Sequence, residues 1–215
     1  MRSLLMAAAI AAAALTATAQ DTFYGQRSSQ FAALPLDSTN IVMLGNSLTN
    51  GGEWHELLGN PKVVNRGISS DIAMGVYNRL DPIVEGKPAK VFLMIGVNDV
   101  SHHISADSIA TDIEKIVARL QEGTPATKIY LQSCLPFNEG FNRWKNLVGK
   151  QETIKELNTL IEAMAARRGC TFVNLYPLFS DGNDNLKEEY TNDGLHLLGP
   201  GYMVWRDAIR PYVDE

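Results

Sequence analysis

Five short apolar runs, separated by segments with helical periodicity, constrain the fold of this chain more than any other feature of its sequence. Each run is too short for a helix, and its apolar residues are nearly consecutive, which is typical of strands buried on both faces of a parallel sheet. The predicted strands are Ile41–Leu44, Val63–Asn65, Val91–Ile95, Ile129–Gln132 and Phe172–Leu175.

Amphipathic helices are predicted between and after these strands. Apolar residues recur at spacings of three and four in Ser105–Glu122 and in Lys150–Arg168. A last helix over Tyr202–Val213 follows a proline and a glycine, and we expect Pro211 to end or kink it near Arg210. Strands that alternate with helices over one domain predict an α/β fold of three layers, with helices on both faces of a parallel sheet.

Polar side chains and glycines follow the predicted strands at their carboxyl ends, where ligands bind in sheets of this kind. Ser47 follows the first strand, Gly67 the second and Asn98 the third, and a loop over 135–146 follows the fourth. We therefore expect residues that are far apart in the sequence to form one site at this edge of the sheet.

Ser47 is the candidate nucleophile of this site. It lies in a glycine-flanked turn before a short helix expected at Glu53–Leu58, where nearby backbone N–H groups would favour developing negative charge. An isolated serine at such a place is more often a turn residue or a helix cap, and the chain has no Gly-x-Ser-x-Gly motif. A nucleophilic serine therefore needs a base within hydrogen-bond reach.

His196 is the candidate base, and Asp193 is its candidate partner. The two lie three residues apart in a polar loop before the last helix, so the carboxylate can accept the Nδ1 proton of the imidazole. A structural loop-capping role for this pair stays open. His55 is expected on the surface of the short helix, and His102 and His103 in a solvated loop, although all three can line the rim of the site.

Asn98 and Gly67 are candidates for stabilising an oxyanion. The Asn98 amide can donate a hydrogen bond to it, together with the backbone N–H groups of Ser47 and Gly67, and Gly67 would let the backbone approach a ligand closely. Simple turn roles remain open for both residues. A serine, a base, a carboxylate and an oxyanion donor at strand ends together indicate a serine hydrolase.

The first 19 residues have the features of a secretory signal peptide. Arg2 precedes an apolar run over Leu4–Leu15, and an Ala-x-Ala site ends at Ala19. The run is shorter than the ~20 residues that span a bilayer. We expect cleavage after Ala19, a periplasmic or secreted protein, and one domain over residues 20–215.

Composition narrows the class of partner. The full chain has a net charge of −5, and loss of Arg2 with the leader makes the remainder −6. This balance argues against nucleic acid or an anionic membrane surface as the main partner. No further apolar run suggests membrane insertion, and no spacing of histidines, cysteines or carboxylates indicates a metal. We expect no cofactor, and the oligomeric state is left open.

The two cysteines are expected to be free. Cys134 lies at the end of one predicted strand and Cys170 at the start of the next, which places them roughly 20 Å apart at ~3.3 Å per residue. A disulfide needs Cα atoms within about 7 Å. Both are therefore predicted to be buried thiols.

These motifs together resemble the SGNH (GDSL-type) hydrolase family. The four matching blocks are Gly45-Asn46-Ser47-Leu48, Gly67, Gly96-Val97-Asn98-Asp99 and Asp193 with His196. Gly52–Asp71, Arg79-Leu80 and Leu195–Tyr202 are similar to its platelet-activating-factor acetylhydrolase-like and sialate O-acetylesterase-like branch.

The resemblance covers the chain from about residue 40 to its end. It implies a flavodoxin-like five-stranded sheet, a Ser47–His196–Asp193 triad, and an oxyanion hole from the Ser47 and Gly67 N–H groups and the Asn98 side chain. Asn46 stands where the family has aspartate. This departure concerns the rigidity of the turn, because position 46 is not the nucleophile.

The function expected is that of an exported esterase acting on small acyl esters, above all acetyl esters of carbohydrates such as O-acetylated sialic acid or polysaccharide sugars. The loop Phe137–Asn146 mixes aromatic and polar side chains. In it, Trp144 could stack on a sugar ring and Arg143 could pair with a carboxylate, although both could equally pack as ordinary loop residues. One alternative is a lysophospholipase or thioesterase, which the lack of an evident apolar lid disfavours. A catalytically silent carbohydrate-binding module is the other, and the joint presence of all the candidate residues argues against it.

Overall fold

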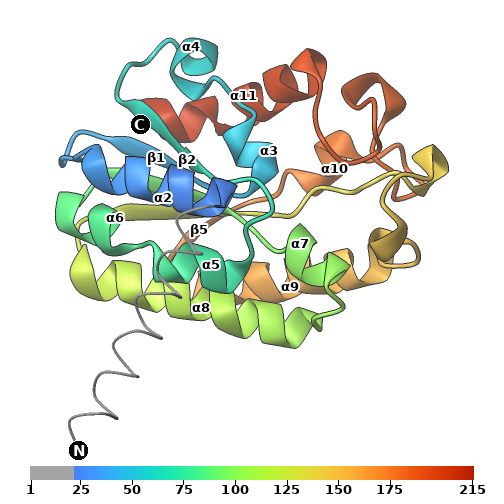
Figure 1. Ribbon diagram of the computed structural model, residues 1–215, viewed down its shortest axis with the longest axis horizontal. Helices are drawn as coiled ribbons and strands as arrows, with labels where there is room; N and C mark the ends of the chain where they lie inside the picture. The colour runs from blue at the N-terminus through green and yellow to red at the C-terminus, as the bar shows by residue number, and fades with distance from the viewer. Residues whose placement is uncertain (1–21) are drawn as a thin grey trace, which may run out of the picture. The chain divides into compact units, whose positions relative to one another are not determined.

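The computed structural model describes residues 22–215, so the expected signal peptide lies outside the described residues. The chain divides into two compact units between Pro35 and Leu36. The first unit contains the helix α2 (Phe23–Ala33), which the side chain of Thr22 caps by accepting a hydrogen bond from the Gly25 N–H. The second unit contains the sheet and the remaining elements (Figure 1).

The second unit is built on a five-stranded parallel sheet with the strand order β2-β1-β3-β4-β5. All five predicted strands are present, with ends displaced by one or two residues. This is the flavodoxin-like order, in which the chain changes direction across the sheet between β1 and β3. The strands are β1 (Ile41–Gly45), β2 (Val63–Gly67), β3 (Lys90–Met94), β4 (Lys128–Gln132) and β5 (Thr171–Val173).

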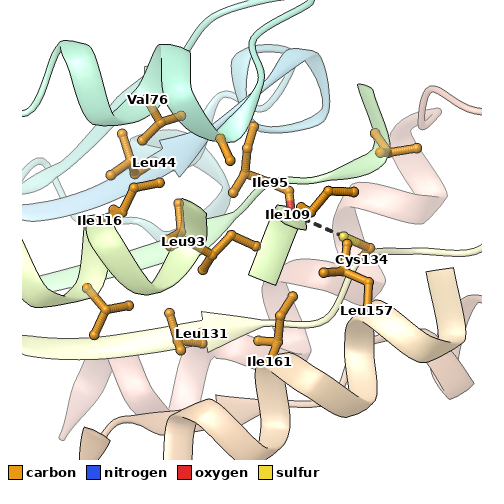
Figure 2. Close-up of a cluster of buried hydrophobic side chains, with 14 of the residues drawn as sticks. Leu44, Val76, Leu93, Ile95, Ile109, Ile116, Leu131, Cys134, Leu157 and Ile161 are labelled. Carbon is orange, nitrogen blue, oxygen red and sulfur yellow. Dashed lines mark hydrogen bonds between the residues drawn. The ribbon is translucent and has the colours of Figure 1, made fainter. Parts of the chain in front are cut away.

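Helices cover both faces of the sheet, which confirms the predicted three-layer α/β fold. Alternate strand residues point to opposite faces, so Val42 and Leu44 join one apolar core and Ile41 and Met43 join the other. The first core (Figure 2) lies against α5 (Ala73–Asn78), α6 (Asp81–Gly86), α7 (Val97–Ser101), α8 (Ala106–Gly123) and α9 (Gln151–Arg168). The second lies against α3 (Ser47–Asn50), α4 (Trp54–Leu58), α10 (Tyr176–Phe179) and α11 (Gly199–Asp214).

Helix α11 continues past Pro211 to Asp214, so the expectation that it ends near Arg210 is wrong. The proline lies in the last turn of the helix. The buried side chain of Lys90, in β3, places its ammonium group at this end of the helix. Its Nζ donates to three carbonyl oxygens, those of Tyr212, Val213 and Glu215, at 2.8–2.9 Å. A cation on these carbonyls also suits the negative end of the helix dipole.

Both cysteines are free. Cys134 is buried, and its thiol donates to the carbonyl oxygen of Ile95 (Figure 2). Cys170 is half-buried rather than buried, because it precedes β5 at the edge of the sheet. Across residues 22–215 no helix combines the length and the apolar character that crossing a bilayer requires.

Loops at the carboxyl ends of the strands complete the second unit. After β4 the chain forms the 3-10 helices η1 (Glu139–Phe141) and η2 (Lys145–Leu147). After α10 it forms η3 (Glu188–Tyr190) and then the loop that leads into α11. The residues singled out in the sequence lie on these loops and on the segments that follow β1, β2 and β3.

Candidate active site

Ser47, His196 and Asp193 form a continuous hydrogen-bonded chain, although Ser47 is 149 residues from His196. The Nε2 atom of His196 lies 3.0 Å from the Ser47 Oγ, and its Nδ1 atom lies 2.7 Å from the Asp193 Oδ2. In this arrangement Nε2 can accept the serine proton while the carboxylate holds the other ring nitrogen protonated. The structure therefore brings the three predicted residues together in the predicted order.

The loop before α11 fixes the Asp193 carboxylate. Its Oδ1 accepts hydrogen bonds from the backbone N–H groups of Leu195 and His196 at 2.9 and 2.8 Å. The Thr191 hydroxyl in turn accepts from the N–H of Gly194 at 2.9 Å. Burial opposes ionisation of Asp193, but the hydrogen bonds from the His196 ring and from the backbone outweigh it and hold the pKa of this carboxyl below its usual value.

Ser47 is the first residue of α3, directly after β1. Asn46 caps this short helix, since its Oδ1 accepts from the Leu48 N–H at 3.0 Å. An asparagine here supplies the same acceptor as the family's aspartate without a buried charge. Tyr202 of α11 donates its hydroxyl to the Leu48 carbonyl at 2.9 Å, so the helix that follows His196 also holds the serine turn.

Gly67 does not occupy the predicted oxyanion-binding role in this structure. Its N–H already donates to the Asn65 Oδ1 at 2.8 Å. A side chain at position 67 would place its Cβ 2.2 Å from the backbone nitrogen of Asn50 in α3. The glycine is therefore required for close approach of the backbone to α3 and not, as expected, to a ligand.

Asn65 joins β2 to the end of α3, and the sequence analysis did not single it out. Its Nδ2 lies within hydrogen-bonding distance of three carbonyl oxygens, those of Thr49, Asn50 and Gly52, at 2.9–3.1 Å. Because its Oδ1 accepts from Gly67, one amide ties both segments together. An asparagine at the end of a predicted strand was the only sequence signal for this role.

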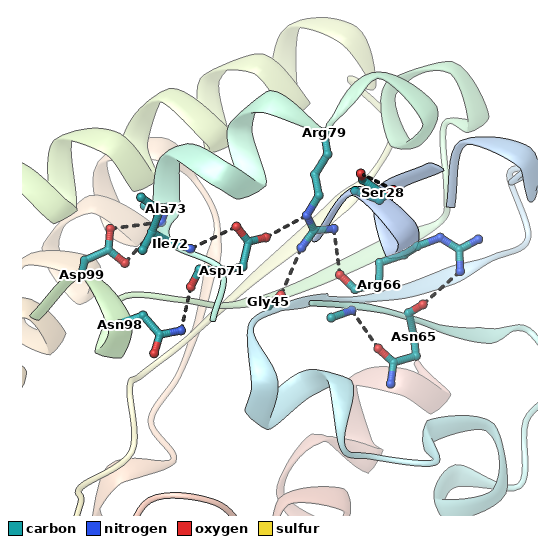
Figure 3. A network of polar contacts seen from close by, with 12 residues as sticks. Ser28, Gly45, Asn65, Arg66, Asp71, Ile72, Ala73, Arg79, Asn98 and Asp99 are labelled. Atoms are coloured by element: carbon teal, nitrogen blue, oxygen red, sulfur yellow. Dashed lines mark hydrogen bonds and ion pairs between the residues drawn. The ribbon is translucent and has the colours of Figure 1, made fainter. Parts of the chain in front are cut away.

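Asn98 is the second residue of α7, which follows β3, and its side-chain amide is held by a hydrogen bond to the segment before α5. Its Nδ2 donates one hydrogen to the Asp71 carbonyl oxygen at 2.8 Å (Figure 3), which leaves the second N–H for another acceptor. Asp71 is itself fixed by a buried ion pair, since the Arg79 Nε donates to its Oδ2 at 2.8 Å. Burial raises the pKa of the Asp71 carboxyl, and the neighbouring guanidinium opposes this rise.

Arg79 extends this support to two strand ends (Figure 3). Its Nη1 donates to the Arg66 carbonyl at 2.9 Å and its Nη2 to the Gly45 carbonyl at 3.0 Å. One buried side chain thus connects the ends of β1 and β2 to the segment that orients Asn98. In the sequence, Arg79 is notable only for its similarity to one branch of the family.

Asp99, the neighbour of Asn98, is buried and accepts a hydrogen bond from the Ala73 N–H at the start of α5. Burial raises the pKa of its carboxyl to about 6. The side chain lies beneath the site and joins α7 to α5 (Figure 3).

A cavity of about 370 Å³ opens beside Asn98. Ser70, three residues after Gly67, lines it, with a backbone φ of 65° that is uncommon for any residue except glycine. The N–H groups of Ser47 and Ser70 donate no hydrogen bond to any residue from 22 to 215. Both N–H groups are therefore free to donate to an acceptor, and Ser70 lines the cavity itself.

Trp144 and Arg143 line the same cavity, in the loop after β4. The edge of the Trp144 ring meets the ring of His196, with centroids 5.2 Å apart. Of the other histidines, His102 lines the cavity, whereas His55 is exposed on α4 beside Glu56. Within the described range, no three metal-binding side chains lie close enough to hold an ion.

Comparison with known proteins identifies the family. The model of the GDSL-like Lipase/Acylhydrolase family matches residues 43–204, which include all the candidate residues above. The chain belongs to the GDSL-like lipase/acylhydrolase family. It is therefore an ester hydrolase of the GDSL type, built on the fold and bearing the side chains described here.

Several known proteins are similar to this chain over most of its length. Subunit alpha2 of platelet-activating factor acetylhydrolase IB from Homo sapiens is 28% identical over 171 residues, 76% of this chain and 71% of that protein. A Streptococcus pneumonia structure named for platelet activating factor is 27% identical, with a TM-score of 0.83 over 95% of this chain and 99% of that one. An acetyl-xylooligosaccharide esterase from Geobacillus Stearmophilus shares the fold, at 18% identity and a TM-score of 0.67 over 84% and 96% of the two chains.

Proposed function

We propose that this protein is an exported serine esterase that removes acetyl groups from carbohydrates, with Ser47 as nucleophile, His196 as base and Asp193 as its orienting carboxylate. The observation that carries the proposal is the hydrogen-bonded chain from Ser47 to Asp193, together with unused donors on Asn98 and Ser70, which line the neighbouring cavity.

The reaction follows from the positions of these groups. The His196 Nε2 takes the Ser47 proton as Oγ attacks the ester carbonyl carbon. The resulting oxyanion is held by the second Asn98 N–H and by the backbone N–H groups of Ser47 and Ser70. The imidazolium then protonates the departing alcohol oxygen, and a water molecule, deprotonated by the same nitrogen, hydrolyses the acyl-serine.

The acetyl and carbohydrate parts of the proposal rest on the cavity. It is small, and its lining combines the exposed ring of Trp144 with polar side chains, a combination that suits a sugar better than an acyl chain. The shared fold with an acetyl-xylooligosaccharide esterase is consistent with this substrate class. Export is proposed from the sequence of residues 1–19 alone.

The test is a series of p-nitrophenyl esters from acetate to octanoate, with Ser47→Ala as the matched inactive variant. We expect turnover to fall as the chain lengthens, and Ser47→Ala to reduce kcat by about 10⁴-fold or more while the far-UV spectrum is unchanged. A fluorophosphonate should label Ser47. A preference for octanoate would favour the lipid-esterase alternative, and labelling elsewhere would remove Ser47 as nucleophile.

The role of Trp144 is tested by comparing acetylated xylose with p-nitrophenyl acetate. If its ring stacks on the sugar, Trp144→Ala should lower kcat/KM several-fold more on the sugar ester than on the aryl ester. If its ring serves mainly to hold His196, which it contacts, the losses on the two substrates should be equal. Expression with and without residues 1–19, followed by fractionation, tests export.

A further inference from the structure

Basic side chains gather at the cavity beside Asn98. His102, Arg143 and Lys145 all line it, and no aspartate or glutamate does so within the described part of the chain. His102 comes from the end of α7, whereas the other two come from the loop after β4. Segments separated by about forty residues therefore supply basic side chains to one concave surface, two of them the cations of Arg143 and Lys145.

This charge is not neutralised by the protein. The Arg143 guanidinium makes no hydrogen bond or ion pair with any residue between 22 and 215, and Lys145 donates to the neutral side chain of Asn142. The two buried carboxylates near Asn98 are engaged elsewhere, Asp71 with Arg79 and Asp99 with the α5 backbone.

The contrast with the rest of the surface is informative, because the chain as a whole is acidic. Many other basic side chains of the second unit, such as Arg119, Lys155 and Arg168, form an ion pair with a nearby carboxylate. A cluster of unneutralised cations beside a set of oxyanion donors creates a local positive potential that attracts anions. Arg143, with its planar fork of donors, suits a carboxylate in particular.

We propose that this cavity is a subsite for a carboxylate carried by the ester substrate, bound by Arg143 and Lys145 with His102 at its side. This rests on the proposed function, since it assumes that Ser47 attacks the ester. The carboxylate can belong to the leaving group, as in an acetylated acidic sugar, or to the acyl group, as in a hemisuccinate. In both cases the enzyme would prefer an anionic ester over its neutral counterpart.

Matched ester pairs test this inference. For the leaving group, 4-acetoxybenzoate is compared with its methyl ester, and for the acyl group, the p-nitrophenyl hemisuccinate is compared with the butyrate. The quantity measured is the ratio of kcat/KM for the anionic ester to that for the neutral ester, so that general effects of a substitution on catalysis cancel. The variants are Arg143→Gln, Lys145→Gln and the double variant.

Lys62→Gln is the matched control. It makes the same change in net charge, but Lys62 is exposed and directly precedes β2, at the opposite edge of the sheet from the site. We expect it to leave the ratio within about twofold of that of the unmodified protein. Arg143→Gln should lower the ratio for one pair by about 5- to 30-fold, as expected for a partly solvated charge-assisted contact, and raising the salt concentration should lower it as well.

The pair that responds identifies where the carboxylate is carried. If the double variant changes both ratios by less than twofold, or no more than Lys62→Gln does, the subsite is refuted. Failure of the unmodified protein to hydrolyse any of these esters, anionic or neutral, would instead refute the proposed function. The subsite would then be judged by calorimetry on Ser47→Ala, where Arg143→Gln must weaken binding of 4-acetoxybenzoate but not that of its methyl ester.

Discussion

Replacing Arg79 by lysine separates the charge of this side chain from its geometry. Lysine can still face Asp71, but a single ammonium group cannot also reach the carbonyl oxygens of Arg66 and Gly45, which Arg79 binds at 2.9 and 3.0 Å. Hydrogen bonds to a charged group contribute about 1.5–3 kcal/mol each. Loss of two in a buried setting should therefore lower the free energy of unfolding by about 3–6 kcal/mol.

Urea denaturation measures this loss, and kcat and KM on p-nitrophenyl acetate measure its effect on the site. Because Asp71 orients Asn98 through its carbonyl, Arg79→Lys should reduce kcat by about 10-fold and change KM little, a smaller effect than removing an oxyanion donor outright. Arg119→Lys is the matched control. Arg119 also binds a carboxylate and a carbonyl, but it is more exposed, so its loss should cost about 1 kcal/mol or less.

The reasoning fails if Arg79→Lys unfolds within 1 kcal/mol of the unmodified protein. It also fails if kcat is unchanged under conditions in which the variant is fully folded. Either result would mean that the strand ends and Asn98 keep their positions without the guanidinium.

Three further predictions concern neighbouring groups. Asn98→Ala should lower kcat about 10²–10³-fold with little change in KM, measured on p-nitrophenyl acetate; a rise in KM alone would make Asn98 a ground-state binding residue. Because burial raises the pKa of Asp99 to about 6, the folded protein binds a proton there that the unfolded chain releases near pH 4, so stability from this group is lost as pH rises through 6. Compared with the unmodified protein, Asp99→Asn should therefore have a higher free energy of unfolding at pH 7.5 than at pH 4.5, by up to about 3 kcal/mol. The prediction is wrong if the difference between the two pH values is the same in the variant and in the unmodified protein. Both Cys134 and Cys170 should react with a thiol reagent after unfolding without reductant, and a native mass two hydrogens lower would show a disulfide instead.

The fold was predictable because the strands are short runs of nearly consecutive apolar residues and the two long helices have clear periodicity. The end of the last helix was not, since the partner that stabilises the turn at Pro211 is Lys90, more than a hundred residues away. Local sequence rules describe the cost of a proline, but they do not reveal a distant cation that offsets it.

The candidate triad was predictable for a similar reason. The loop around Asp193 and His196 is organised by contacts within a few residues, and only Ser47 had to come from elsewhere. The role of Gly67 was predicted wrongly because a glycine indicates that another group comes close to the backbone but does not identify that group. Here the group is the backbone of α3. Ser70 was overlooked because its positive φ is imposed by the surrounding segment and is not visible in a serine's propensities.

The position of Trp144 also allows ligand binding to be followed by the fluorescence of the protein's own tryptophans. The chain contains three tryptophans, of which Trp54 and Trp205 are fully enclosed and lie against each other with ring centroids 4.8 Å apart. Trp144 is 36% exposed and borders the cavity. A quencher dissolved in water, such as acrylamide, should therefore quench the fluorescence of Trp144 but not that of Trp54 or Trp205. Any molecule that fills the cavity should reduce that quenching, so occupancy can be followed in unlabelled protein without turnover.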